Sequence, residues 1–188
     1  MLQFSPVTRN IIFICVAVFI IQVILKERAT QLLELYPINT PYFKPYQLFS
    51  YMFAHGGTSH VFFNMLTLAF VGPQLEMIWG QQRFLVFYVV TGIGAALIYL
   101  AAEYFLNPFQ GHPMLGASGA IYGLLMAFGL LMPDRVINLM IPPVSIKAKY
   151  LVFILGGISL FFGGANTAHA AHFGGAFVGF VMIKIFKF

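Results

Sequence analysis

The sequence predicts an all-α membrane protein with six transmembrane helices, in a single domain over residues 1–188. Of the 188 residues, 60% are hydrophobic and only 8% are charged, whereas a soluble domain carries roughly 25% charged residues. Long apolar stretches alternate with short segments rich in Gly, Pro or charge, and one span of a bilayer takes about 20 helical residues. A membrane β-barrel is disfavoured because these stretches lack the two-residue alternation of barrel strands.

Six apolar stretches are expected to form the helices, near residues 11–25, 59–79, 84–105, 115–132, 149–163 and 169–187. Arg9 precedes the first stretch as in a secretory signal, but no small-residue cleavage pattern follows, so we expect a retained helix. Residues 26–58 form a long connection that is expected to lie partly in the membrane interface. Residues 133–148 form a second connection, in which charges and Pro142 and Pro143 interrupt the apolar pattern. The chain ends soon after the sixth stretch, so no seventh helix is expected.

Charge sets the expected orientation of these helices. Lys and Arg total 10 against 5 for Asp and Glu, and basic residues in short loops concentrate on the cytoplasmic side of a membrane. With a cytoplasmic N-terminus, the basic residues inside are Arg9, Arg83, Arg135, Lys147, Lys149, Lys184 and Lys187, and those outside are Lys26, Arg28 and Lys44. Both termini are therefore expected in the cytoplasm, and the second, fourth and sixth helices run from the outer surface inward. No basic cluster is typical of DNA or RNA binding, so no nucleic-acid partner is expected.

Four uncharged polar side chains are expected at one depth in the membrane. His60 and Asn64 are four residues apart near the outer end of the second helix, and therefore share one helical face. Ser118 and His172 lie close to the outer starts of the fourth and sixth helices. Polar side chains in a membrane are costly unless they face the bundle interior or water, so the four residues predict a shared cavity.

Small residues offer a way for Ser118 and His172 to meet. The fourth and sixth helices each carry two glycines four residues apart, Gly119 with Gly123 and Gly175 with Gly179. Such pairs let helix backbones approach closely in a membrane. A serine hydroxyl becomes a nucleophile when a base within about 2.6–3.2 Å accepts its proton, and a neutral imidazole is suited to this near pH 7. His60 and Asn64 would then donate hydrogen bonds to a developing oxyanion.

Spacing alone leaves three interpretations open. In the first, the glycines are only packing seams, Ser118 bonds back to its own helix and His172 is a satisfied interhelical histidine. The second is a metal site built from the histidines, namely His55, His60, His169 and His172, but no acidic residue or cysteine lies beside them. The lone Cys15 has no partner for a disulfide or a metal site. The third interpretation is peptide hydrolysis.

Three motifs resemble those of the rhomboid family of intramembrane serine proteases, and the resemblance covers nearly the whole chain. They are His-x-x-x-Asn at 60–64, Gly-x-Ser-Gly at 116–119 and Ala-His-x-x-Gly-x-x-x-Gly at 171–179. The resemblance implies a six-helix core in which Ser118 is the nucleophile and His172 the general base. It also implies that His60 and Asn64, with backbone N–H groups around Ser118, form the oxyanion hole. Gly116 and Gly175, which belong to the last two motifs, are expected to support the site.

Further roles follow from the same resemblance. The acidic residues are Glu27, Glu34, Glu76, Glu103 and Asp134, and none is expected in the outer turns of the three site helices, which agrees with a catalytic dyad. Tyr122 lies four residues after Ser118 and is available to pack against His172. Glu76 resembles a structural acidic residue of the family, and His55 one that supports the first external loop.

Parts of the loops are less regular. Tyr46 and Gln47 stand where many members of the family carry Trp-Arg, which leaves the anchoring of the first external loop open. His169 is expected to face the water-filled cavity, and the connection around residues 161–170 is expected to cap it.

The expected activity is cleavage of transmembrane protein substrates near their outer ends through an acyl-enzyme on Ser118. Neither a metal nor another cofactor is implied, and the expected location is the bilayer of the bacterial inner membrane. One alternative is a catalytically inactive rhomboid relative that binds membrane proteins, although Ser118 and His172 are both present. Another is a small transporter or channel, which would place polar groups across the bilayer midplane rather than at one outer depth.

Overall fold

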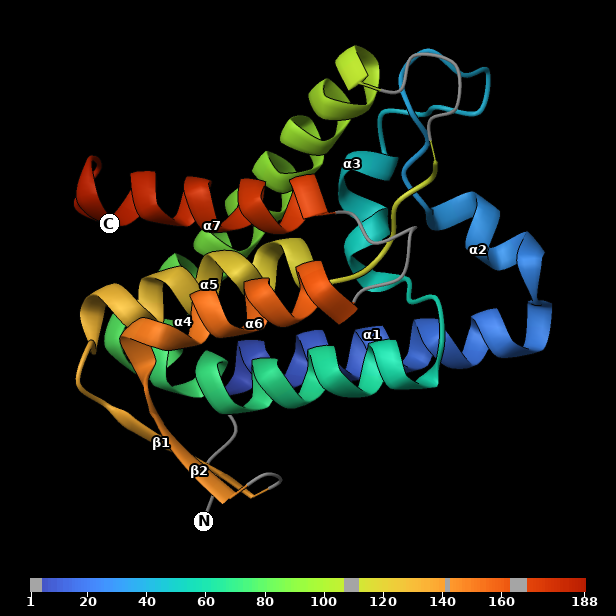
Figure 1. Cartoon of the computed structure of the whole chain (residues 1–188). Coiled ribbons are helices and arrows are strands. Elements are labelled where there is room, and N and C mark those ends of the chain that lie inside the picture. The colour runs from blue at the N-terminus through green and yellow to red at the C-terminus, as the bar shows by residue number, and fades with distance from the viewer. Residues whose placement is uncertain (1–4, 107–111, 141–142, 163–168) are drawn as a thin grey trace.

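The computed structural model describes residues 5–106, 112–140, 143–162 and 169–188. These residues are mostly helical, with one short β-hairpin (Figure 1). In chain order the elements are α1 (Pro6–Leu25), α2 (Glu27–Leu33), α3 (Gln47–Ser50), the 3-10 turn η1 (Tyr51–Phe53), α4 (Thr58–Leu106), α5 (Ser118–Leu131), β1 (Val136–Met140), β2 (Pro143–Lys147), α6 (Ala148–Phe162) and α7 (His169–Lys184).

Helix α4 contains two of the expected helices. Its 49 residues are interrupted at Gly80, whose φ of 75° and ψ of 167° are not helical. Glycine adopts a positive φ without a steric penalty, so the chain changes direction there. The helices expected at 59–79 and 84–105 are therefore the first arm of α4 (58–79) and its second arm (81–106). The other expected helices appear as α1, α5, α6 and α7.

Helices α4, α5 and α7 pack against one another, and α1 lies alongside α4 (Figure 1). Large side chains fill the core between them, among which Phe84, Phe87, Tyr88 and Phe128 are almost fully buried. The first turns of α4, α5 and α7 lie at the end of the bundle that carries α2 and α3 (Figure 1). The β1–β2 hairpin and the last turn of α7 lie toward the opposite end. The three helices therefore run in the same direction through the bundle.

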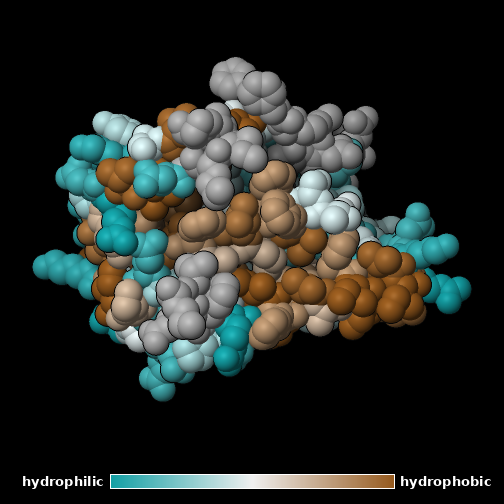
Figure 2. Space-filling model, turned by 90° about the horizontal axis from the view of Figure 1, so that it is seen from below, coloured by the Kyte–Doolittle hydropathy of each residue, from teal (hydrophilic) through white to brown (hydrophobic). Residues whose placement is uncertain are grey.

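Many large hydrophobic side chains are exposed on the surface of the bundle. Figure 2 shows a hydrophobic band between two more hydrophilic ends on the face that carries α1. In α1, Phe13, Val23 and Ile24 are among the exposed hydrophobic side chains. Across the described ranges, α1 and α4 are the two helices long and apolar enough to cross a membrane, while α5 and Ala148–Ser159 of α6 are apolar but shorter. Helix length therefore does not confirm the expected count of six spans.

The connections contain more structure than expected. The segment 26–58 holds α2, α3 and η1, and the segment 133–148 holds an antiparallel hairpin in which Ile137 pairs with Ile146. Lys147 and Lys149 both contact Asp134, at 3.2 and 3.4 Å, next to the strands. The expected cap at 161–170 falls largely on residues 163–168, which lie outside the described ranges.

A buried carboxylate ties α1 to α4. The Glu76 carboxylate accepts hydrogen bonds from the backbone N–H groups of Val7 and Thr8, at 3.0 and 2.8 Å, and from the Thr8 hydroxyl at 2.8 Å. The first N–H groups of a helix have no partner within it, and α1 has no cap from its own N-cap side chain. Glu76, 3% exposed, thus completes the first turn of α1 from a distant helix, which agrees with a structural role.

Candidate active site

Ser118 is the first residue of α5, and the segment before it is held on both sides. Leu35 and Met114 exchange two backbone hydrogen bonds of 2.8 and 2.9 Å. Gly116 follows with φ 124° and donates its N–H to the carbonyl oxygen of Tyr51 at 2.9 Å. These contacts fix the turn that delivers Ser118 to the cavity, and the positive φ explains why glycine suits position 116.

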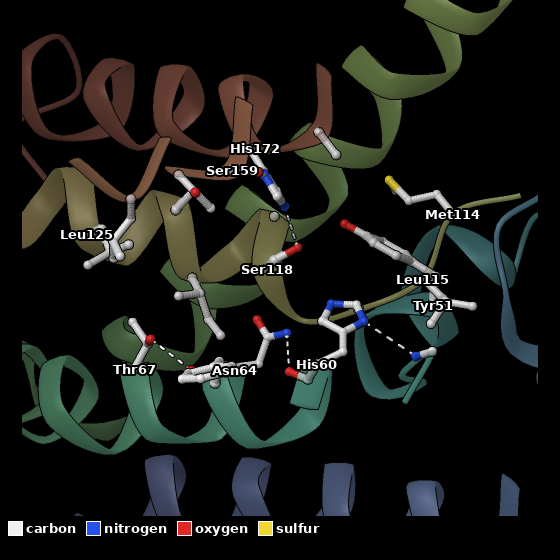
Figure 3. A pocket seen from close by; sticks show the side chains of 18 of the residues that line it. Tyr51, His60, Asn64, Thr67, Met114, Leu115, Ser118, Leu125, Ser159 and His172 are labelled. Carbon is white, nitrogen blue, oxygen red and sulfur yellow. Dashed lines mark hydrogen bonds between the residues drawn. The ribbon is translucent and has the colours of Figure 1, made fainter. Parts of the chain in front are cut away.

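The structure brings Ser118 and His172 into contact. His172 lies in the first turn of α7, and its Nε2 atom is 2.8 Å from the Ser118 Oγ (Figure 3). The approach depends on glycine, because a Cβ atom on Gly175 would overlap the carbonyl oxygen of Gly119. A Cβ on Gly179 would lie 2.7 Å from the carbonyl oxygen of Gly123. The prediction that the two glycine pairs allow α5 and α7 to approach closely is confirmed.

Two further side chains contact the imidazole of His172. The ring of Tyr122 stacks on it, with centroids 4.3 Å apart and an interplanar angle of 13°. The hydroxyl of Ser159, on α6, lies 3.0 Å from its Nδ1 atom. Sequence reasoning missed Ser159 because it belongs to none of the three motifs. The available signal was a polar residue inside an apolar helix, which costs free energy in a membrane and often marks a function.

His60 and Asn64 lie across the cavity from Ser118, on the first arm of α4 (Figure 3). Asn64 donates one amide hydrogen to the His60 carbonyl oxygen at 2.9 Å. The His60 Nδ1 atom accepts the N–H of Gly56 at 3.4 Å. A Cβ on Gly116 would lie 2.8 Å from His60 Nε2, so this nitrogen faces the turn before Ser118. No hydrogen bond joins either residue to Ser118 within the described part of the chain.

One cavity of about 790 Å³ collects most of the predicted site residues. Its lining includes Ser118, His172, His60, Asn64, Tyr122 and Gly116, together with Ser159. Gly175 does not line it and lies in the contact between α5 and α7. A second cavity, of about 740 Å³ and largely apolar, is lined mainly by α6 and α7. Tyr122, Ser159 and His172 line both cavities, so the imidazole stands between them.

Two other histidines lie outside the Ser118–His172 contact. His55 precedes α4, and its backbone N–H donates to the Gln22 side-chain oxygen at 2.9 Å, which ties this turn to α1. Burial, followed by the nearby His60, lowers the pKa of His55 to about 4. His169 lines the second cavity and not the one that holds Ser118, contrary to expectation. Among the described residues, no group of three or more His, Cys, Asp or Glu side chains is placed to hold a metal ion.

The sequence of this chain is similar to a known family model and to several known proteins. A family model described as a Rhomboid domain matches residues 42–187. The Rhomboid protease GlpG of Yersinia pestis (strain Pestoides F) is 26% identical over 184 residues, which cover 96% of this chain and 62% of that protein. RHOMBOID-like protein 5 of Arabidopsis thaliana is 31% identical over 139 residues, 73% of this chain and 42% of that protein. The chain thus spans less than two thirds of the length of these relatives.

Proposed function

Because the chain belongs to the rhomboid family, we propose that this integral membrane protein is a serine endopeptidase that cleaves transmembrane protein substrates near their outer ends. The observation that carries the proposal is the 2.8 Å contact between Ser118 Oγ and His172 Nε2 inside a cavity. Six spans would come from α1, the two arms of α4, α5, α6 and α7, in a single domain. The proposed location is the bacterial inner membrane, with both termini in the cytoplasm.

In the first step, His172 acts as general base. Its Nε2 takes the proton of Ser118 as the Oγ attacks the scissile carbonyl carbon, which requires a neutral ring with its hydrogen on Nδ1. The peptide bond then breaks as the imidazolium returns that proton to the leaving amine. This leaves an acyl-enzyme on Ser118. Water, activated by the same imidazole, releases the second product and restores the hydroxyl.

The start of α5 supports stabilisation of the oxyanion. Ser118, Gly119 and Ala120 form the first turn, whose backbone N–H groups have no intrahelical acceptor, and no side chain at the N-cap bonds to them. The positive end of the helix dipole adds to their attraction for an anion. From the opposite wall, His60 would donate from Nε2, because its Nδ1 accepts from Gly56. Asn64 retains a second amide hydrogen for the same purpose.

Substrate preference follows from the state of the scissile bond. A carbonyl inside an intact helix accepts a backbone hydrogen bond, and neither its carbon nor its oxygen is then free to enter the site. Segments that unwind readily near the outer interface, with small or helix-breaking residues, are therefore the proposed targets. The position of Ser118 in the first turn of α5 supports cleavage near the outer end of a substrate helix.

The test is cleavage of a model transmembrane substrate in proteoliposomes. Ser118→Ala and His172→Ala should each lower kcat by about 10³-fold or more, because the two groups act as a unit. His60→Ala and Asn64→Ala should each cost roughly 10²-fold through loss of an oxyanion donor. A chelator should leave the rate unchanged. Equal cleavage by wild type and both Ser118 and His172 variants would refute the proposal.

Labelling by a fluorophosphonate separates the protease from an inactive binder of membrane proteins. An activated Ser118 reacts with the reagent without any knowledge of the physiological substrate. Wild type should label and His172→Ala should not. Binding of a transmembrane segment with neither labelling nor cleavage would favour the inactive relative. The intact contact between Ser118 and His172 argues against that outcome.

A further inference from the structure

Both ring nitrogens of His172 have a partner in the structure. Nε2 contacts the Ser118 hydroxyl at 2.8 Å, and Nδ1 contacts the Ser159 hydroxyl at 3.0 Å (Figure 3). A catalytic base is commonly oriented by a third group on the nitrogen that does not face the nucleophile. Here that group is an uncharged hydroxyl supplied by a different helix, α6.

The geometry of the ring shows what this contact adds. Stacking on Tyr122 restricts tilt of the imidazole out of its plane, since the two rings are nearly parallel. Stacking does not restrict rotation of the imidazole within that plane. Hydrogen bonds at both edges of the ring do so, because any in-plane rotation lengthens one of them. Loss of the Ser159 contact would leave the distance between Nε2 and Ser118 less well defined.

The proton on the ring gives the same residue a second effect. The hydrogen bond made by one imidazole nitrogen determines which nitrogen carries the proton. A hydroxyl has free lone pairs and rotates, so the Ser159 Oγ can accept a hydrogen from Nδ1. It continues to accept that hydrogen when Nε2 takes the Ser118 proton and the ring becomes an imidazolium. The Nδ1 hydrogen is therefore bonded to the Ser159 hydroxyl both before and after Nε2 takes the Ser118 proton.

We propose that Ser159 is a positioning residue, whose hydroxyl accepts the Nδ1 hydrogen of His172 and keeps Nε2 directed at Ser118. This inference rests on the proposed function of the Ser118–His172 pair. Among the described hydrogen bonds it is the one that joins α6 to α7. The alignment of the base is thus linked to the placement of α6, whose described buried residues, Ala148, Leu151 and Val152, all lie in its first turns.

The kinetic test compares Ser159→Ala with Ser159→Thr, which keeps a hydroxyl. Loss of one neutral hydrogen bond of ordinary net strength corresponds to roughly a three- to tenfold fall in rate. We expect that fall in kcat for Ser159→Ala, with KM nearly unchanged and most of the rate restored in Ser159→Thr. Ser145→Ala is the matched control, because its hydroxyl bonds to Asn138 in the β1–β2 hairpin and Ser145 lines neither cavity. It should cleave like wild type. Equal kcat for Ser159→Ala and wild type would overturn the inference.

A spectroscopic test does not depend on cleavage. Nitrogen NMR of histidine-labelled protein, with His172 assigned by comparison with His172→Gln, should show hydrogen on Nδ1 in the wild type. In Ser159→Ala the two tautomers should mix. An unchanged spectrum would overturn the role of Ser159 even in an enzyme that cleaves. Failure of the wild type to cleave would instead refute the proposed function, and the tautomer shift would still decide the role of Ser159.

Discussion

The two sides of His172 are packed in different ways. On one side, α5 and α7 approach until a Cβ on Gly175 would overlap the backbone of Gly119. On the other side, Gly157 of α6 has open space where a Cβ would lie, and Phe153 is 69% exposed. The tight side sets the distance between nucleophile and base. The looser side leaves room beside them for cavities and supplies one hydrogen bond to the ring.

The contrast shows that adjacent glycines in a membrane helix do not always mark a close helix contact. Both α6 and α7 contain adjacent glycines, Gly156 with Gly157 and Gly174 with Gly175. Lipid is as apolar as a protein interior, so helices associate through close packing rather than burial, and small residues permit it. Only the α7 pair is used in this way, because Gly156 has nothing nearer to its Cβ position than Tyr122 at 3.9 Å.

The largest difference in stability is expected between two glycine-to-alanine variants, one on each side of His172. Gly175→Ala must separate α5 from α7, and overpacking of this kind costs about 3 kcal/mol or more when backbone has to move. Gly157→Ala meets no atom and adds a residue of higher helix propensity, so stability should stay equal or rise slightly. Unfolding in detergent and fluorophosphonate labelling of both variants measure this. Similar losses in the two variants would remove the distinction between the sides.

A smaller difference is expected from truncating one phenylalanine on each side. Phe128 of α5 is fully buried, and Phe128→Ala should cost about 2–3 kcal/mol. This is less than the roughly 3–5 kcal/mol of a soluble core, because lipid is as apolar as the protein interior and the loss comes mainly from the cavity. Phe153 of α6 is mostly exposed, and Phe153→Ala should change the free energy of unfolding by less than about 0.5 kcal/mol. The same unfolding assay applies. A large loss in Phe153→Ala would mean that α6 packs more tightly than its exposure indicates.

The smallest effect concerns the turn before α4, at the end of the bundle where α4, α5 and α7 begin. The pKa of His55 is lowered from 6.5 to about 4, first by burial and then by His60. The unfolded chain therefore binds a proton that the folded protein resists, so stability is fully present above pH 6.5 and declines as the pH falls toward 4. Between pH 6.5 and about pH 5 the loss should be on the order of 1–2 kcal/mol. His55→Asn should flatten this part of the pH profile, and an unchanged profile would contradict the assignment.

Most of the predicted site residues were identified from local sequence patterns. A motif fixes which residues share a helical face, and the charge pattern fixes the direction of each helix, so Ser118 and His172 were expected at one depth. The glycine pairs then indicated which helices touch. Gly80 also lies between the two helices expected at 59–79 and 84–105, where the structure breaks α4.

Features that depend on tertiary contacts escaped prediction. The hairpin forms from short segments around Pro142 and Pro143, which interrupt the apolar pattern without specifying what replaces it. The contact of Ser159 with His172 depends on how α6 lies against α7, and no spacing along the chain encodes that. His169 and His172 are three residues apart and share one side of α7, and both line the second cavity, but of the two only His172 also lines the cavity that holds Ser118. The spacing does not specify which cavity each side chain reaches.

The link between α1 and Glu76 has a consequence for the order of assembly. The N–H groups of Val7 and Thr8 are synthesised first, but the carboxylate that satisfies them lies 69 and 68 residues further along the chain. Until the first arm of α4 has entered the membrane, water at the interface must solvate the start of α1. Helix α1 therefore docks after α4 is in place, although it leaves the ribosome before it.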